Sequence, residues 1–318
     1  MAVYILKRLV YVGFILVLIS MPVFGITQVL PGNVAYVIAG QFAPPDVVRA
    51  VEDKLGLHDT IVVQYWRWAS KMLRGDLGDS LIMERPIGPI VGEAIQRSAV
   101  LALISFFFIA VVGIGLGVLA AIRHNRPIDH AVSTFTYLGI SVPEFFWGLV
   151  LILVFARTLQ WLPTGGYAPI DKGLWPWLRH LIMPAATLTF AFIAHVSRLT
   201  RSSMLETMQS HFVRTARAKG LPERVVIVRH ALRNALLPTI TVLAIDVGAL
   251  IGGIVVVEIV FSYPGLGRML IFAIERHDLP LIQASILVVS AIYCLANLTA
   301  DLLYAYFNPK IRYGRVRL

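Results

Sequence analysis

The chain has 318 residues, of which 58% are hydrophobic and only 14% are charged. A soluble globular domain carries roughly 25% charged residues. This composition therefore excludes an ordinary soluble enzyme, a disordered protein and a disulfide scaffold, and it favours a polytopic membrane protein. The single cysteine, Cys294, excludes an intramolecular disulfide and a cysteine-based metal site. The formal net charge is +10, and it can be interpreted only once the side of the membrane on which each basic residue lies is known.

Six segments are apolar enough to be expected as membrane-spanning helices, which need roughly 20 such residues. They are residues 9–30, 98–122, 131–156, 181–197, 234–257 and 279–307. Lys7 and Arg8 precede the first segment as they would in a signal peptide, but its apolar run is too long and lacks an Ala-x-Ala cleavage site. We therefore expect a retained first helix and an all-α fold with six transmembrane helices.

The distribution of basic residues predicts the orientation of the chain. With the N-terminus inside, the inner segments 1–8, 123–130, 198–233 and 308–318 hold 16 Lys and Arg residues, and the outer segments hold 12. Without the long outer segment 31–97, which would be translocated regardless of its charge, the outer count falls to 5. The charge bias therefore predicts that both termini lie inside, and it removes the reason to expect a nucleic-acid partner.

Three regions are expected from this topology: an N-terminus with the first span (1–30), a small extracytoplasmic helical lobe (31–97), and a five-helix transmembrane core (98–318). In the lobe, one amphipathic helix is expected after Pro44-Pro45-Asp46 and a second from Ile61 to Gly75, with Tyr65, Trp68 and Met72 on one side. The lobe is interpreted either as a cap on the membrane domain or as a docking surface for an external partner.

The inner segment 198–233 carries eight basic residues and clear helix boundaries. A short helix is predicted from Ser210 to Lys219, with Phe212 and Ala216 on one face, and Gly220 is typical of the residue that follows a helix. Pro222 and Glu223 favour the start of a second helix, whose apolar stripe would contain Val225, Val228 and Leu232. The hairpin is interpreted either as a basic loop attracted to anionic lipid or as an arm that docks a cytoplasmic subunit.

No motif for catalysis or for cofactor binding is present in the chain. It has no Gly-x4-Gly-Lys-Ser/Thr loop for ATP, no His-Glu-x-x-His and no Gly-x-Ser-x-Gly. None of the eight histidines pairs with another at ligand spacing. The sequence therefore predicts a non-catalytic protein without a metal or cofactor of its own.

A series of short motifs runs along the whole chain. They include Tyr4-Ile5-Leu6-Lys7-Arg8-Leu9, Pro31-Gly32-Asn33, Gly75-Asp76-Leu77-Gly78-Asp79-Ser80, Ser141-Val142-Pro143-Glu144-Phe145-Phe146, Leu162-Pro163-Thr164-Gly165-Gly166, Arg214-Thr215-Ala216-Arg217-Ala218-Lys219-Gly220, His230-Ala231-Leu232-Arg233-Asn234-Ala235-Leu236-Leu237-Pro238, Phe261-Ser262-Tyr263-Pro264-Gly265-Leu266-Gly267 and Asn308-Pro309-Lys310-Ile311-Arg312-Tyr313. In order and spacing they make the chain similar to the first permease subunit of the dipeptide/oligopeptide/nickel class of ABC importers.

The resemblance implies an importer permease of the bacterial or archaeal inner membrane that carries short peptides or a related solute. Its implied partners are a second homologous permease, two cytoplasmic ATPase subunits that bind ATP and Mg, and an extracytoplasmic solute-binding protein. The implied ATPase-coupling residues are Arg214, Thr215, Ala216, Arg217, Ala218, Lys219, Gly220, Leu221, Pro222, Glu223 and Arg224. The general importer consensus begins this loop with Glu-Ala-Ala, and Arg214-Thr215-Ala216 departs from it in the same way as the peptide/nickel branch.

Acidic residues inside the predicted spans are candidates for the translocation pathway. Glu144 and Asp246 would line it and attract a cationic substrate group, or they would form buried hydrogen bonds between helices. Gly113, Gly115 and Gly117, like Gly248, Gly252 and Gly253, are expected to let helices approach closely.

Two other classes of protein compete with the importer permease. An ion-driven secondary transporter would show internal repeats, which are not obvious here, and a membrane enzyme would need the catalytic motifs that the chain lacks. The sequence does not distinguish dipeptides, oligopeptides, nickel, glutathione or opines as the transported solute.

Overall fold

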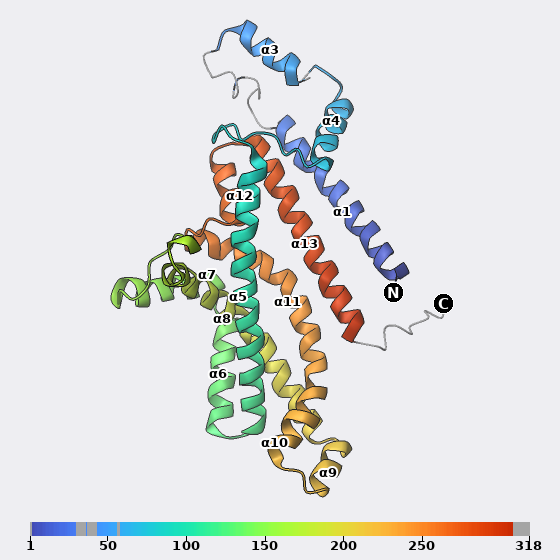
Figure 1. The fold of residues 1–318 in the computed structure, drawn as a ribbon, viewed down its shortest axis with the longest axis vertical. Helices are drawn as coiled ribbons and strands as arrows, with labels where there is room; N and C mark the ends of the chain where they lie inside the picture. The colour runs from blue at the N-terminus through green and yellow to red at the C-terminus, as the bar shows by residue number, and fades with distance from the viewer. Residues whose placement is uncertain (1, 30–35, 37–42, 56–57, 308–318) are drawn as a thin grey trace. The chain divides into compact units, whose positions relative to one another are not determined.

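The computed structural model describes residues 2–29, 36, 43–55 and 58–307, which are almost entirely helical (Figure 1). The α-helices are α1 (Ala2–Val29), α3 (Pro45–Leu55), α4 (Ile61–Leu73), α5 (Ile87–Ile122), α6 (Pro127–Ser141), α7 (Glu144–Leu151), α8 (Leu174–Met208), α9 (His211–Ala218), α10 (Glu223–Val225), α11 (Arg233–Val260), α12 (Leu266–Glu275) and α13 (Leu279–Phe307). Two π-helical segments, Ile152–Thr158 and Val226–Leu232, continue α7 and α10, and Ile170–Lys172 is a 3₁₀ turn. The expected all-α class is confirmed, and α3 and α4 lie where two short amphipathic helices were predicted.

Five helical segments of the described residues are long and apolar enough to cross a membrane: Ile5–Gly25, Ile87–Ile122, Leu174–Met208, Glu223–Val260 and Leu279–Leu303. They correspond to five of the six predicted spans. Residues 181–197, predicted as a short span, lie inside the 35-residue helix α8. The helix continues beyond the apolar run through residues 198–208, where leucine, methionine, arginine and glutamate are good helix formers.

The third predicted span, residues 131–156, is not one straight helix. Here α6 ends at Ser141, α7 begins at Glu144, and the two are bent by 107°. Pro143 disfavours helical backbone at the residue before it, and Val142 is accordingly extended, with φ −111° and ψ 129°. Glu144 therefore begins a new helix after a sharp bend, and the two helices together remain long and apolar enough to count as a sixth candidate span that is broken at this bend.

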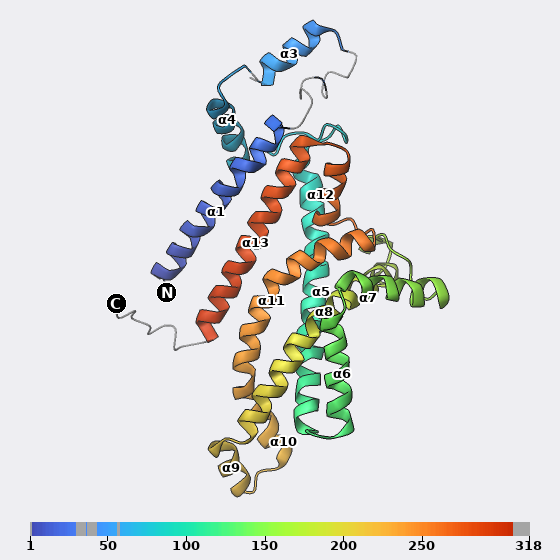
Figure 2. The same ribbon diagram turned by 180° about the vertical axis from the view of Figure 1, so that it is seen from behind.

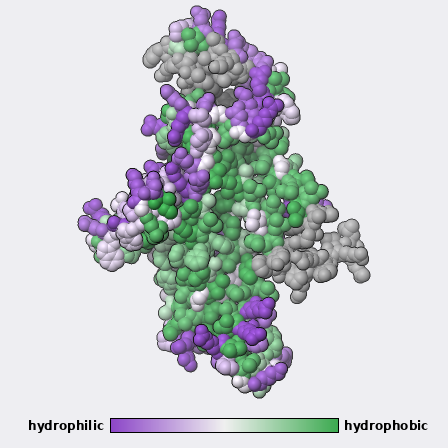
Figure 3. Space-filling model, viewed as in Figure 1, coloured by the Kyte–Doolittle hydropathy of each residue, from purple (hydrophilic) through white to green (hydrophobic). Residues whose placement is uncertain are grey.

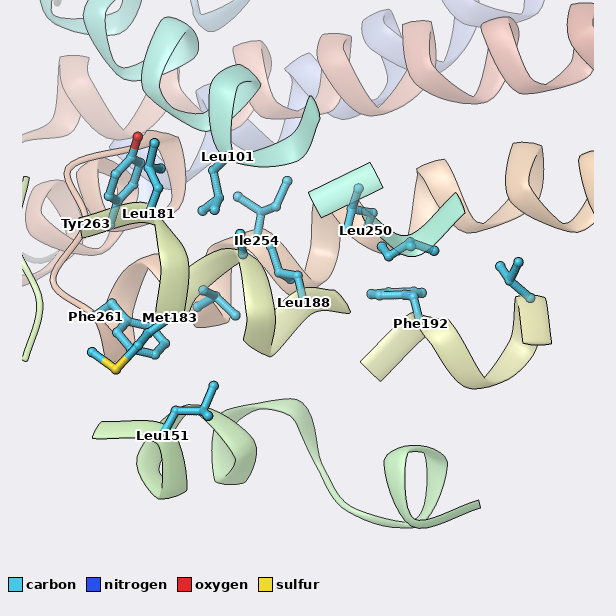
Figure 4. Close-up of a cluster of buried hydrophobic side chains, with 14 of the residues drawn as sticks. Leu101, Leu151, Leu181, Met183, Leu188, Phe192, Leu250, Ile254, Phe261 and Tyr263 are labelled. Carbon is cyan, nitrogen blue, oxygen red and sulfur yellow. The ribbon is translucent and has the colours of Figure 1, made fainter. Parts of the chain in front are cut away.

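The chain divides into two compact units, one containing residues 97–264 and 296–318 and the other residues 2–96 and 265–295. The core of the first unit is a cluster of buried apolar side chains from α5, α7, α8 and α11, which meet around Leu101, Leu188 and Ile254 (Figure 4). Helices α8 and α11 lie side by side in this unit (Figures 1 and 2). Helix α8 ends just before α9 and α11 begins after α10, so this pair of helices holds the segment that contains α9 at both of its ends.

Two of the motifs in the first unit pack against each other. A Cβ at Gly165 would collide with the backbone oxygen of Phe261, and the amide of Gly166 donates to that oxygen at 2.7 Å. The Tyr263 hydroxyl donates to the Arg97 carbonyl, and the Arg97 guanidinium lies 4.9 Å from the Tyr167 ring centre. The Leu162–Gly166 motif is thus explained by close backbone packing.

In the second unit, the Gly75–Ser80 motif forms a turn that is fixed by a buried carboxylate. Gly75 and Gly78 have φ of 80° and 75°, in the left-handed region that favours glycine. The Ser80 hydroxyl donates to Asp278, which also accepts from the amides of Leu81 and Ile82 and precedes α13. The turn motif therefore positions a loop against the start of α13.

Candidate functional site

Residues 214–224, predicted as the ATPase-coupling loop, form an exposed helical turn between α8 and α11. Residues 214–218 are the second half of α9, residues 219–222 make the turn, and Glu223 and Arg224 begin α10. Figure 3 shows hydrophilic surface gathering at the end of the first unit where α9 and the α5–α6 turn lie, below an apolar flank. This end of the unit is suited to contact with water or with a soluble protein.

The C-terminus of α9 has the hydrogen bonds of a Schellman turn. The amide of Gly220 donates to the carbonyl of Arg217 at 2.9 Å, and the amide of Leu221 donates to the carbonyl of Ala216 at 3.4 Å. Gly220 has φ of 77°, and a Cβ built on it would meet no atom within 4 Å. The backbone angle, and not a lack of space, therefore favours glycine here, as the sequence predicted.

One side of α9 is anchored by apolar contacts. Val213 and Ala216 are fully or almost fully buried in a cluster with Met204 of α8, Val226, Ala231 and Ala235. The sequence placed Phe212 beside Ala216, but Phe212 is 46% exposed. The buried stripe is therefore shifted by one residue, and an aromatic side chain remains on the outer surface of α9.

The predicted second helix continues directly into α11 through the π-helix Val226–Leu232. A π-helical turn contains more residues than an α-helical turn, so a stripe predicted at α-helical spacing does not stay on one side. Val226 and Ala231 are buried, whereas Val228, which was predicted to share the buried stripe, is 55% exposed. The hairpin is therefore connected to the membrane helix α11 without an intervening loop.

An ion pair closes the turn between α9 and α10. The Arg217 guanidinium donates to both carboxylate oxygens of Glu223, at 2.7 and 3.1 Å. This hydrogen bonding raises the pKa of the Arg217 side chain. Arg217 is thus engaged within the hairpin, which leaves Arg214, Lys219 and Arg224 as exposed cations around it.

A buried carboxylate joins α8 to the turn between α5 and α6. Asp129 is 1% exposed, and its oxygens accept hydrogen bonds from Arg201 of α8 at 2.6 and 2.8 Å. The amide of Asn125 donates to the same carboxylate at 2.9 Å, and His124 Nδ1 lies 3.3 Å from it. This clamp lies two turns before the end of α8, and it therefore fixes the helix that carries α9.

The sequence reasoning missed the Asp129 clamp. Asp129 is the third residue of α6, where an acidic side chain commonly faces free backbone amides. That local signal was available, whereas the pairing with Arg201 depends on the packing of α8.

Asp246 lies on α11 and faces His195 of α8. The Oδ1 atom of Asp246 is 3.6 Å from His195 Nδ1. The Asp246 residue is 7% exposed, and among the described residues its Oδ2 atom has no hydrogen-bond partner. His195 itself is half exposed, with 44% of its side chain accessible. One side of this pair is therefore open to the surface of the unit.

Glu144 lies against the same helix, α11, but next to Gly253 rather than next to Asp246. A Cβ built on Gly253 would lie 2.6 Å from Glu144 Oε2, so the glycine leaves the space that the carboxylate occupies. Gly253 follows Asp246 by seven residues, which corresponds to two turns or about 10 Å along a helix. The structure thus brings both predicted acids to α11, about 10 Å apart along its axis, but it does not bring them into contact.

No group of three or more His, Cys, Asp or Glu side chains gathers as metal ligands within the residues that the structure describes. The candidate site therefore consists of an exposed helical arm and two acids within the membrane helices.

Comparison with protein families gives two adjacent matches that cover nearly the whole chain. Residues 113–313 match the model of the binding-protein-dependent transport system inner membrane component. Residues 1–111 match the model of the N-terminal part of the same membrane components.

Full-length relatives and a solved structure agree with these matches. The chain is 39% identical to a probable peptide ABC transporter permease protein of Sinorhizobium fredii, over 98% of this chain and 100% of the relative. It is also 39% identical to the glutathione transport system permease protein GsiC of Escherichia coli K12, over 98% and 99% of the two chains. An inward-facing structure of the MetNI methionine ABC transporter is similar in fold, with a TM-score of 0.56, 15% identity, and coverage of 69% of this chain and 96% of that one.

Proposed function

Because the chain belongs to the family of binding-protein-dependent transport system inner membrane components, it is a non-catalytic permease subunit of an ABC importer, and we propose that it carries short peptides. Family membership excludes the ion-driven secondary transporter and the membrane enzyme. Peptide and glutathione permeases are among its full-length relatives, and a short peptide is the substrate class that they share. The amino terminus of such a peptide is cationic, and it would be complementary to a pathway that contains Glu144 and Asp246.

The observation that supports the coupling role is the construction of α9. Helix α9 is anchored on one side by Val213 and Ala216 and is joined to α10 by the Arg217–Glu223 ion pair across the turn, and α10 continues through a π-helix into α11. A displacement of α9 is therefore transmitted to α8 and α11 without passing through a flexible loop. Exposed Phe212 offers an apolar contact, and Arg214, Lys219 and Arg224 favour an acidic rim on the ATPase, which sets orientation more than affinity.

The proposed partners follow from the role of this chain as a permease that contacts separate ATPase subunits. A second homologous permease completes the pathway, two cytoplasmic ATPase subunits bind ATP and Mg and receive the α9 arms, and an extracytoplasmic solute-binding protein delivers the peptide. No cofactor is proposed for this chain itself. Both termini and α9 lie on the cytoplasmic side of the inner membrane in this arrangement.

Glu144 and Asp246 are proposed to line the pathway. Intramembrane carboxylates are costly unless they meet protein or water, and the open side of the His195–Asp246 pair supplies such access. Asp246 would attract the ammonium group of the peptide, and Glu144 would offer a second carboxylate about two turns away along α11.

The coupling role is tested by substituting Gly220 in the assembled importer. Valine at φ 77° is strained by about 1–2 kcal/mol, and it should distort the turn and abolish solute-stimulated ATP hydrolysis and uptake. Asparagine, which tolerates this conformation, is the matched control and should retain both. A cysteine at Ala218 should crosslink to the ATPase in the otherwise unchanged protein.

Two results together would contradict the coupling role. They are normal uptake by Gly220→Val and the absence of any crosslink from cysteines placed between residues 214 and 224. Loss of membrane insertion by Gly220→Val would indicate a folding defect. The crosslinks from residues 214–224 would then decide whether this segment contacts the ATPase.

A further inference from the structure

Helix α4 carries two apolar stripes along neighbouring sides. The first contains Ile61, Tyr65, Trp68 and Met72, and the second contains Val62, Trp66, Ala69 and Leu73. Both follow the spacing i, i+4, i+7, i+11, which places each set along one side of a helix. The third side is polar and contains Gln64, Arg67 and Lys71.

The first stripe contacts α1 through Tyr65 and Trp68, whereas Ile61 at its start is 56% exposed. The Tyr65 hydroxyl is 2.7 Å from Ser20 Oγ at hydrogen-bond distance. The ring of Phe24 lies 5.6 Å from that of Tyr65 and 5.5 Å from that of Trp68, measured between centroids. Helix α4 therefore lies beside the last turns of α1, as Figures 1 and 2 both show.

This contact fixes the depth of α4 relative to a membrane. Ser20 and Phe24 belong to Ile5–Gly25, an apolar segment long enough to cross a bilayer. Ser20 precedes the end of that segment by five residues, or about 8 Å along a helix. Helix α4 thus lies at the level where the acyl chains meet the headgroups.

The large side chains of the second stripe are exposed on the surface of the structure. Val62 and Trp66 are each 71% exposed, and Leu73 is 87% exposed. Fully exposing such side chains to water is unfavourable by about 1.5–3 kcal/mol each relative to burial. Tryptophan beside arginine and lysine is the composition of helices that lie in a membrane interface.

We propose that the second stripe of α4 rests on phospholipid, with Val62, Trp66 and Leu73 in the acyl boundary and with Arg67 and Lys71 near the headgroup phosphates. The occupant is lipid rather than a protein partner because the attachment to α1 holds the stripe at membrane depth. Helix α4 would then anchor the segment between α1 and α5 to the bilayer surface. The proposal does not depend on the transported solute or on the role of α9.

The test places a bimane probe on α4 in the complete importer reconstituted in phosphatidylcholine nanodiscs. In a Cys294→Ala background, Trp66→Cys carries the probe on the second stripe, and Lys71→Cys is the matched control on the polar side of the same helix. Lipids with a doxyl group high on the acyl chain should quench the Trp66 probe about threefold more than the Lys71 probe. Val62→Cys repeats the measurement should the Trp66 variant not assemble.

Aqueous iodide should give the opposite order, with stronger quenching at Lys71. Equal quenching of both positions by doxyl lipid would overturn the proposal. So would protection of the Trp66 probe that arises only when the solute-binding protein is added, since that protein and not lipid would then cover the stripe.

Discussion

At the scale of single residues, the Asp129 clamp is the polar interaction that best explains how α9 is held in place. Asp129 is almost fully buried, and Arg201 supplies two of the hydrogen bonds that its carboxylate accepts. A buried carboxylate that loses its cation is left with an uncompensated charge. The Arg201–Asp129 pair therefore adds a polar attachment of α8, the helix that leads to α9, to the α5–α6 turn.

Arg201→Gln should therefore lower the stability of the assembled importer by about 2–4 kcal/mol. Arg198→Gln is the matched control, because Arg198 is an exposed arginine one turn earlier on α8. Thermal unfolding of the detergent-purified complexes measures the difference. A melting temperature for Arg201→Gln equal to that of the control would show that the clamp has no structural importance.

Asp246→Asn tests the proposed pathway at the same scale. Asparagine keeps the shape of the side chain but removes its charge, so peptide uptake should fall at least about tenfold, the effect of roughly 1.4 kcal/mol. Basal ATP hydrolysis and assembly should persist. Thr241→Val on the same helix is the control, because the Thr241 hydroxyl donates to the Leu237 carbonyl of its own helix.

Dissociation of the Asp246→Asn complex would instead assign Asp246 a structural role. Unchanged uptake by a well-assembled variant would remove Asp246 from the pathway.

At the scale of helices, two glycines determine how closely α5 approaches α8. A Cβ on Gly117 would lie 2.6 Å from the Ser197 carbonyl oxygen and from Thr200 Cβ, and one on Gly113 would lie 2.8 Å from Val196 Cγ1. The two glycines are four residues apart and form the small-residue surface that lets membrane helices pack closely. Gly115 faces elsewhere and has nothing within 4 Å of its Cβ position.

Gly117→Ala should therefore destabilise the protein by about 1–3 kcal/mol, because the added methyl group meets backbone rather than the end of a flexible side chain. Gly115→Ala, two residues away on the same helix, should have no such effect. The fraction of folded protein recovered after heating, measured by size-exclusion chromatography, compares the two variants. Equal recovery of the two variants would mean that the close packing of α5 on α8 at Gly117 does not contribute to stability.

At the scale of the whole molecule, α8 provides the best test of the predicted orientation. Its 35 residues are about 52 Å long, which exceeds the 40–45 Å of a complete bilayer. Asp171 precedes α8 and Lys219 follows it, so the two residues must lie on opposite sides of the membrane if α8 crosses it.

A cysteine at Asp171 should react with an impermeant thiol reagent in intact cells, and one at Lys219 should react only after permeabilisation. The charge bias predicts external labelling at Asp53 and protection at Arg315, which lies outside the described residues. External labelling at Lys219 would reverse the predicted topology and exclude α9 from contact with a cytoplasmic ATPase.

The sequence by itself determined the features that arise from local physics. Apolar length predicted the membrane helices, since any segment buried in a bilayer must satisfy its backbone hydrogen bonds as helix. The positive φ at Gly220 and the helices α3 and α4 could also be predicted from the sequence, because neighbouring residues determine a helix end and an amphipathic stripe. The ordered motifs determined the family.

The tertiary structure alone decided which of these local features meet. It selected Gly113 and Gly117 over Gly115, paired Asp129 with Arg201, and set His195 against Asp246. It also buried Val213 in place of Phe212, because Val213 packs in a cluster with Met204 and Val226. The glycine contacts and the two acid–base pairs join residues that are 51 or more positions apart, and periodicity along one segment carries no information about the neighbour that it will face.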